Sequence, residues 1–267
     1  MIVDTVRIPY KGYGQTLRIC SVSDMHEGHV NQDESALRQT LSQEDCYFTF
    51  NGDNWDSIVL ADRRYHKSMD RTVGDAILDE IFESMFYKLK PVANRILWIH
   101  RGNHEDVILR RFGTDLTARL CKELGTLYAG YSSLIGVICH KTGKGGGGVR
   151  SVDFRCHHGW GGGCRTIGSV ITKYSHDVKY WDADVYVYGH DHALHSVPIP
   201  RGRRANKKLL ADDKHIILSG TYLRTYTDTT DASWHETKGF PLTKIGSPVI
   251  NITPTAHKWV KITVDTQ

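Results

Sequence analysis

The sequence LRICSVSDMH, residues 17–26, shows the pattern that decides the fold. Its first six residues are typical of a buried strand, and polar side chains begin where that strand ends. The same pattern recurs at Cys46–Phe50, which leads into Asp53, and at Arg95–Ile99, which leads into Asn103. Ligands of α/β proteins gather at the carboxyl ends of strands. The sequence therefore predicts a cluster of polar side chains at one edge of a buried sheet.

Helical segments separate these predicted strands. Asp33-Glu34 begins a predicted helix that runs to Leu41, and the segment from Met69 to Leu89 has apolar residues at helical spacing. Glu105–Arg111 and Leu116–Leu124 resemble a broken helical pair. Alternation of strand and helix predicts a layered α/β fold.

The second half of the chain is mostly short predicted strands. The segments are Leu134–Cys139, Val149–Cys156, Val185–Tyr188, His195–Ile199, His215–Leu218, Val249–Ile252 and Trp259–Val264. One helix is expected there, near Ile167–Val178, and the glycine-rich Gly143–Gly148 indicates a hairpin tip. No repeat or linker interrupts the chain. We therefore expect residues 1–267 to form one domain with two sheets packed face to face.

The composition is that of an ordinary soluble globular protein. Of the 267 residues, 40% are hydrophobic and 24% are charged. Met1–Asp4 lacks the basic start and apolar stretch of a secretion signal, and no apolar run approaches the ~20 residues that span a bilayer. The six cysteines are scattered, without a Cys-x-x-Cys pair. We expect a cytoplasmic protein that does not contact membranes.

One basic cluster, Arg201–Lys208, stands out against a modest net charge of +4. It has two interpretations. The cluster is either a solvated hairpin tip or a contact for a phosphate backbone, since lysine and arginine clusters hold polyphosphate chains.

Five short motifs carry the potential chemistry, and each follows a strand-like run. They are Asp24-Met25-His26, Gly52-Asp53-Asn54, Gly102-Asn103-His104-Glu105, His157-His158-Gly159 and Gly189-His190-Asp191-His192. Together they offer two aspartates, one asparagine and at least three histidines, which suits two divalent metals better than one. Two metals about 3.5–4 Å apart are typical of enzymes that catalyse displacement at phosphorus.

In this order, the five motifs resemble the signature of the calcineurin-like metallophosphoesterase superfamily. The resemblance implies an α/β fold, a four-layer α-β-β-α sandwich of two mixed sheets. It also implies the metal ligands: Asp24, His26 and His192 for the first ion, Asn103, His158 and His190 for the second, and Asp53 bridging the two. His157 precedes the ligand position, and alternating strand residues face opposite sides. We therefore expect His158 to be the ligand rather than His157.

The resemblance also assigns the catalytic side chains. Two metals lower the pKa of a shared solvent molecule, and the hydroxide then attacks phosphorus. His104 follows a ligand without being one, so it is the expected proton donor to the leaving group. Asp56 is expected to orient His104; its alternative role is to cap the turn after Trp55. Manganese is the first expected metal, and iron, zinc, cobalt and nickel also suit the ligands.

Three functions are compatible with these motifs. The protein phosphatase branch keeps a phosphate-binding arginine where this chain has Ser57, so a phosphodiesterase acting on nucleotides or single-stranded nucleic acid is favoured. A phosphomonoesterase of the serine/threonine phosphatase type is the alternative, and a non-catalytic scaffold is the third. Trp160 either stacks on a base or covers the sandwich edge. The oligomeric state stays open.

Overall fold

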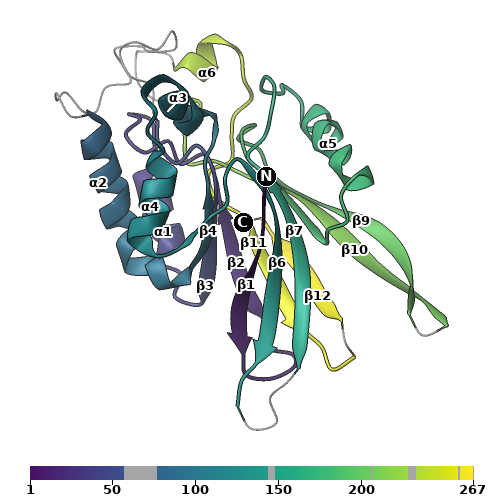
Figure 1. The fold of residues 1–267 in the computed structure, drawn as a ribbon. Coiled ribbons are helices and arrows are strands. Elements are labelled where there is room, and N and C mark those ends of the chain that lie inside the picture. Colours follow the sequence, from purple (N-terminus) through teal and green to yellow (C-terminus); the bar gives the residue numbers. More distant parts are fainter. Residues whose placement is uncertain (57–76, 144–147, 206, 228–232, 258, 267) are drawn as a thin grey trace.

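The computed structural model describes residues 1–267 except 57–76, 144–147, 206, 228–232, 258 and 267. The described strands form two six-stranded sheets, which pack face to face (Figure 1). Both sheets mix parallel and antiparallel neighbours.

The first sheet has the order β12-β11-β2-β3-β4-β5. Its strands are β2 (Leu17–Val22), β3 (Cys46–Asn51), β4 (Ile96–His100), β5 (Leu127–Tyr128), β11 (Val249–Pro254) and β12 (Val260–Asp265). β2, β3 and β4 are parallel neighbours. Their carboxyl ends therefore share one edge, and the first three motifs follow these three ends.

The second sheet has the order β1-β6-β7-β8-β10-β9. Its strands are β1 (Ile2–Tyr10), β6 (Ser132–Lys141), β7 (Val149–His157), β8 (Val185–Tyr188), β9 (Leu194–Ala205) and β10 (Lys208–Ser219). β7 and β8 run parallel, and the last two motifs follow them. Both sheets thus deliver their motifs to the same end of the molecule.

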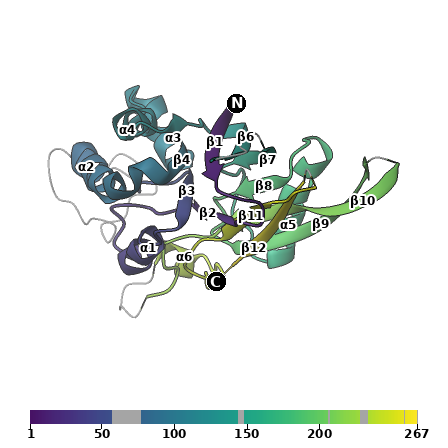
Figure 2. The same ribbon diagram turned by 90° about the horizontal axis from the view of Figure 1, so that it is seen from below.

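Helices cover the outer faces of the two sheets (Figure 2). On the first sheet lie α1 (Glu34–Leu41), α2 (Ile77–Leu89), α3 (Asn103–Phe112) and α4 (Leu116–Leu124); on the second lies α5 (Ile167–Ser175). Three apolar cores separate the layers, one under each helical layer and one between the sheets. Phe48 and Trp55 belong to the first core, Trp98 and Phe154 to the central one, and Tyr174 to the third. The predicted four-layer α-β-β-α sandwich of two mixed sheets is confirmed.

The structure differs from the sequence-based expectation at a few elements. β1 is missing from the predicted strands, because it is an edge strand in which only Ile8 and Tyr10 are buried. The short helix α6 (Trp234–Thr237) and the 3₁₀ turn Asp177–Lys179 add to the one helix expected in the second half, and a 3₁₀ turn at Lys90–Arg95 follows α2 in the first half. Residues 69–76 of the predicted second helix, like most of the loop at Gly143–Gly148, lie outside the described residues.

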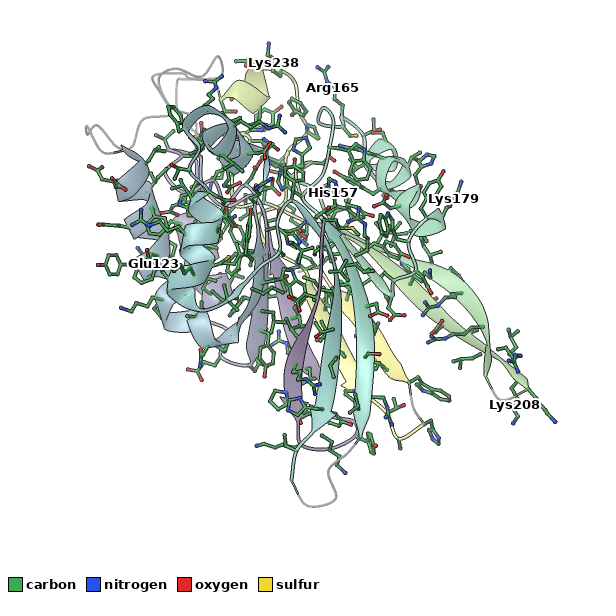
Figure 3. The ribbon with its side chains drawn as sticks, in the orientation of Figure 1. Glu123, His157, Arg165, Lys179, Lys208 and Lys238 are labelled. Carbon is green, nitrogen blue, oxygen red and sulfur yellow. The ribbon has the colours of Figure 1, made fainter. Side chains whose placement is uncertain are left out.

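β9 and β10 extend as a long antiparallel hairpin, far beyond the predicted His195–Ile199 and His215–Leu218. Arg201 pairs with Asp184 and Asp212, and Arg203 pairs with Asp212. Figure 3 shows Lys208 at the far end of this hairpin, away from the end where the motifs meet. Acidic partners therefore neutralise part of the basic cluster, and its remainder lies remote from the site.

No described helix is long and apolar enough to cross a bilayer.

Candidate metal centre

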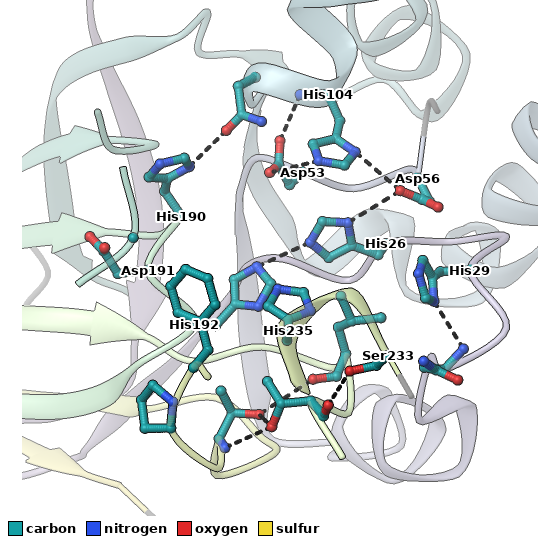
Figure 4. Close-up of a pocket in the computed structure, with 18 of the residues that line it drawn as sticks. His26, His29, Asp53, Asp56, His104, His190, Asp191, His192, Ser233 and His235 are labelled. Atoms are coloured by element: carbon teal, nitrogen blue, oxygen red, sulfur yellow. Dashed lines mark hydrogen bonds and ion pairs between the residues drawn. The ribbon is translucent and has the colours of Figure 1, made fainter. Parts of the chain in front are cut away.

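All nine predicted site residues come together at one end of the sandwich, and Figure 4 shows six of them: His26, Asp53, Asp56, His104, His190 and His192. They are Asp24, His26, Asp53, Asp56, Asn103, His104, His158, His190 and His192. They follow five strands of the two sheets, and all lie in loops except Asn103 and His104, which begin α3. Within the described residues, three groups of potential metal ligands form there, and two match the predicted division between a first and a second ion.

The first group consists of Asp24, His26 and His192. The two imidazole Nε2 atoms lie 3.2 Å apart, and His192 Nε2 lies 3.4 Å from Asp24 Oδ1. Asp24 is fully buried, and Ser23 donates a hydrogen bond to its other oxygen. Three donor atoms from two sheets therefore converge on one point.

The second group consists of Asp53, His158 and His190, with Asn103 among them. Asn103 Oδ1 lies 3.0 Å from His158 Nε2 and 2.8 Å from His190 Nδ1. His158 Nε2 is also 3.3 Å from Asp53 Oδ2. The Asp53 carboxylate thus belongs to this group, and its neighbours His26 and His104 connect it to the first.

Backbone carbonyls select which nitrogen of each ring faces the centre. His158 Nδ1 lies 2.8 Å from the Asn51 carbonyl, and His190 Nε2 lies 2.7 Å from the Gly161 carbonyl. Carbonyls only accept, so these nitrogens carry a proton, and in the neutral form of each ring the opposite nitrogen keeps a lone pair. Hydrogen bonds of this kind fix the tautomer of metal-ligating histidines.

The loops adopt strained backbone conformations at the site. Six described non-glycine residues have a positive φ, and five are candidate ligands: Asp24, His26, Asp53, His190 and His192. Each such residue costs roughly 1–3 kcal/mol, which the surrounding structure must offset. Strain of this kind concentrates at functional sites. The conformations therefore point to a role beyond packing.

Glycines allow close contact between two pairs of neighbouring motifs, the third with the second and the fifth with the first. A Cβ on Gly102 would lie 2.2 Å from the backbone nitrogen of Asp53, and one on Gly189 would lie 2.2 Å from Ser23 Oγ. Neither position has room for any side chain. The glycines of the second-sheet and first-sheet motifs are therefore required by close packing around the centre.

Negative charge dominates the electrostatics of the centre. Burial alone would raise the pKa of Asp53, but His158 and His104 hold it well below its usual range. Burial likewise raises the pKa of Asp24, and His192 more than offsets it. Burial lowers the pKa of His158, yet the Asp53 and Asp24 carboxylates raise it to about 10. The site therefore favours a cation.

The donor set fits divalent metal ions. Two buried carboxylates, one amide oxygen and four imidazoles offer the mixed oxygen and nitrogen ligands that manganese, iron and zinc accept. In the described part of the chain, every ion pair of Asp24 and Asp53 is with a histidine, and none is with lysine or arginine. Buried carboxylates need compensating charge. Metal ions at the two groups would supply it.

Asp56 contacts both His104 and the candidate ligand His26. Its Oδ1 lies 3.2 Å from His104 Nδ1 and 3.7 Å from His26 Nδ1. With Nδ1 held by Asp56, His104 presents Nε2 to the centre, 3.9 Å from Asp53 Oδ2. The His104 backbone nitrogen also donates to Asp53 Oδ1. The geometry required for the expected Asp56–His104 pair is present.

His157 and Trp160 turn away from the candidate ligands. His157 Nδ1 accepts a hydrogen bond from the Gly159 backbone nitrogen, and its ring packs edge-on against Trp160 and Tyr131. Trp160 packs against Tyr174 as well and does not line the cavity. Of its two interpretations, covering the sandwich edge is the one that this packing favours.

The adjacent histidines therefore make a matched pair of test positions. Replacing His158 by alanine removes a fully buried imidazole that contacts Asn103 and Asp53, so we expect it to deplete about one of two bound metals. Replacing His157 should leave occupancy near two. Metal content measured by plasma mass spectrometry checks this, and the reverse pattern would reassign the ligand.

Sequence reasoning gave no role to two buried acids within the motifs. Glu105 accepts hydrogen bonds from the backbone nitrogens of Gly102, Asn54 and Trp55, which ties the second motif to the third. Asp191 accepts from Tyr174, Lys173 and the Cys164 backbone nitrogen, which fastens the loop after His158 to α5. Their position inside a motif could have marked them in the sequence, but only the tertiary contacts show which groups they bind.

A cavity of about 210 Å³ opens beside the centre. Candidate ligands and His104 line one side of it. The other side is a wall formed by Leu223, Thr225, His235, Phe240 and Pro241, here called the C-terminal wall. No sequence motif marks these residues. Their place became visible only once the fold brought α6 next to His192.

Comparisons with known proteins give remote structural similarity. No protein-family model matches the chain, and no curated protein matches it at a significant level. Similar solved structures include a single mutant of Vps29 from Entamoeba histolytica, with 12% identity over 94% of this chain and 99% of that one and a TM-score of 0.37.

A metallophosphoesterase from Sphaerobacter thermophilus has 12% identity over 93% of this chain and 88% of that one, with a TM-score of 0.40. A protein serine/threonine phosphatase from Saccharomyces cerevisiae has 14% identity, covers 94% and 80%, and has a TM-score of 0.28. At these values, no function carries over from the neighbours to this chain.

Proposed function

We propose that this chain is a calcineurin-like metallophosphoesterase that hydrolyses phosphodiesters of nucleotides or nucleic acids with two divalent metal ions, manganese being the first choice. One observation carries the proposal. Donor atoms from all five motifs meet as two adjoining ligand groups, with Asp53 in the second group and the Asp56–His104 pair beside them. A buried cluster of this composition has no evident structural purpose without cations.

In this proposal, Asp24, His26 and His192 would hold the first ion, Asn103, His158 and His190 would hold the second, and Asp53 would be the shared ligand. Bound metals supply a nucleophile at neutral pH and neutralise charge on phosphate oxygens. The protein's own contribution is positional. His104 donates its Nδ1 hydrogen to Asp56, and as an imidazolium it also carries a proton on Nε2, which it would deliver to the leaving group. The Asp56 carboxylate orients the ring and stabilises this charged form.

A diester is favoured because the described cavity lining lacks lysine and arginine. Arg101, the arginine of the third motif, contacts Asp106, Asp115 and Tyr128 instead. A dianionic monoester gains most from a bidentate guanidinium, whereas a monoanionic diester needs less added positive charge. Ser57, where the phosphatase branch has its arginine, lies outside the described residues.

We therefore expect diester turnover to exceed monoester turnover by about tenfold or more. The measurement compares bis(p-nitrophenyl) phosphate with p-nitrophenyl phosphate at equal metal loading, so that the leaving group is the same. An interaction difference of about 1.4 kcal/mol gives this factor. Equal or faster monoester hydrolysis, or release of phosphate from a phosphopeptide, would favour the phosphatase alternative. Stoichiometric metal binding with no turnover of either ester would favour a scaffold.

A further inference from the structure

We infer that the C-terminal wall binds a flat, uncharged ring carried by the substrate, as a nucleobase is, with Phe240 and His235 as the residues that select it. The inference rests on the proposed phosphodiester hydrolysis, because it specifies the organic group attached to the phosphate. It concerns residues outside the five motifs.

The C-terminal wall is attached directly to the metal centre. Thr221 Oγ1 and the Tyr222 backbone nitrogen both donate to the Asp24 carbonyl, at 2.9 and 3.0 Å. Further along, Tyr226 donates its hydroxyl hydrogen to the Phe240 carbonyl at 2.9 Å, and the Thr243 backbone nitrogen donates to Thr225 Oγ1. The wall is therefore held at a defined position relative to the ligands, as a specific binding surface requires.

The aromatic rings of the C-terminal wall lie close to the candidate metal ligands. The His235 ring lies beside that of His192 (Figure 4), with 5.3 Å between the ring centres. The Phe240 ring centre is 5.7 Å from that of His235. A phosphate held between the two ligand groups would carry its ester substituent toward one side of the cavity or the other. On this side, the substituent meets aromatic and aliphatic surface.

The chemistry of the wall suits a nucleobase. Leu223, Phe240 and Pro241 offer carbon surface, and the His235 ring packs edge-on against the Phe240 ring. No described lining residue is a lysine or arginine that would hold a second phosphate or an acidic peptide. Bases stack readily on aromatic side chains.

Phe240 is held in place from the opposite loop by Gly163. A Cβ added to Gly163 would lie 2.7 Å from Phe240 Cε1, so Gly163→Ala must displace the ring. A Cβ added to the adjacent Gly162 would have no atom within 4 Å. Neither glycine lies among the candidate ligands. The chain thus provides a matched pair of substitutions that differ in their effect on Phe240.

The test compares two esters with the same leaving group, thymidine 5′-(p-nitrophenyl) phosphate and methyl p-nitrophenyl phosphate. We expect wild-type kcat/KM to favour the thymidine ester by about tenfold or more, a factor typical of one base stacked on an aromatic ring. Phe240→Leu and Gly163→Ala should bring the ratio near one, and Gly162→Ala should preserve it. Because each ratio is taken within one protein, differences in folding or metal content cancel.

Calorimetric titration with thymidine 5′-monophosphate and methyl phosphate gives a second readout that needs no turnover. The nucleotide should bind about tenfold more tightly to the wild type and lose this advantage in Phe240→Leu. Equal affinities together with a rate ratio near one in the wild type would overturn the inference and leave the proposed hydrolysis intact. Failure to hydrolyse either ester at full metal loading would reject the hydrolysis itself, while titration would still test the wall.

Discussion

Asp53→Asn is expected to lower diester turnover by roughly 10³-fold and to reduce bound metal below one ion per chain. Asp53 is nearly fully buried, lies 3.3 Å from His158 and belongs to the second ligand group. An asparagine keeps the size of the side chain but removes the negative charge that attracts both ions. Metals contribute several kcal/mol to catalysis at phosphorus, and 1.36 kcal/mol corresponds to a factor of ten.

The measurement pairs steady-state rates with metal content by mass spectrometry. Asp45→Asn is a suitable control, because Asp45 forms a largely exposed ion pair with Arg18 away from the site. Surface pairs of this kind contribute little to stability. Full activity of Asp53→Asn with two metals retained would rule out Asp53 as the shared ligand.

His104→Asn is expected to leave both metals in place and to slow diesters that have a poor alkoxide leaving group by 10²–10⁴-fold, the usual value of general acid catalysis. That factor corresponds to about 3–5.5 kcal/mol of barrier. The reason is geometric: His104 Nδ1 lies against Asp56, which leaves Nε2 facing the centre. A nitrophenolate leaves without much proton assistance. The substitution should therefore slow a nitrophenyl diester by a factor at least about tenfold smaller.

Asp56→Asn should show the same leaving-group dependence in weaker form, since Asp56 acts through His104. Rates for an alkyl and a nitrophenyl diester, measured beside metal content, separate the possibilities. An equal loss on both esters would mean that His104 stabilises charge on the phosphate, and loss of metal would make it a ligand.

The motifs were predictable because they follow local rules. Strands such as Leu17–Val22 and Cys46–Asn51 are apolar segments that end in polar side chains, and parallel neighbours bring those ends to one edge. The orientation of the imidazole rings of the candidate ligands was harder to predict from the sequence. The hydrogen bond from His158 to Asn51 links two sheets, and no local pattern encodes it.

The rest of the site depends on tertiary packing. His235 lies on a four-residue helix without a recognisable motif, and its ring lies 5.3 Å from that of His192. Thr221, earlier in the same part of the chain, donates a hydrogen bond to the Asp24 carbonyl. The edge strand Ile2–Tyr10 escaped prediction for a related reason, since few of its side chains are buried and its partner Ser132–Lys141 is distant in sequence. Both features depend on contacts between residues that are far apart in the sequence.

Titration of the metal-free protein with manganese tests the proposed dinuclear centre most directly. Bound metal and hydrolysis of bis(p-nitrophenyl) phosphate are followed together as the metal is added. Two ligand groups joined through Asp53 predict that binding saturates at two ions per chain and that turnover rises steeply with the second. Saturation at a single ion with full turnover, or two bound ions without any turnover, would contradict a phosphodiesterase with two cooperating metals.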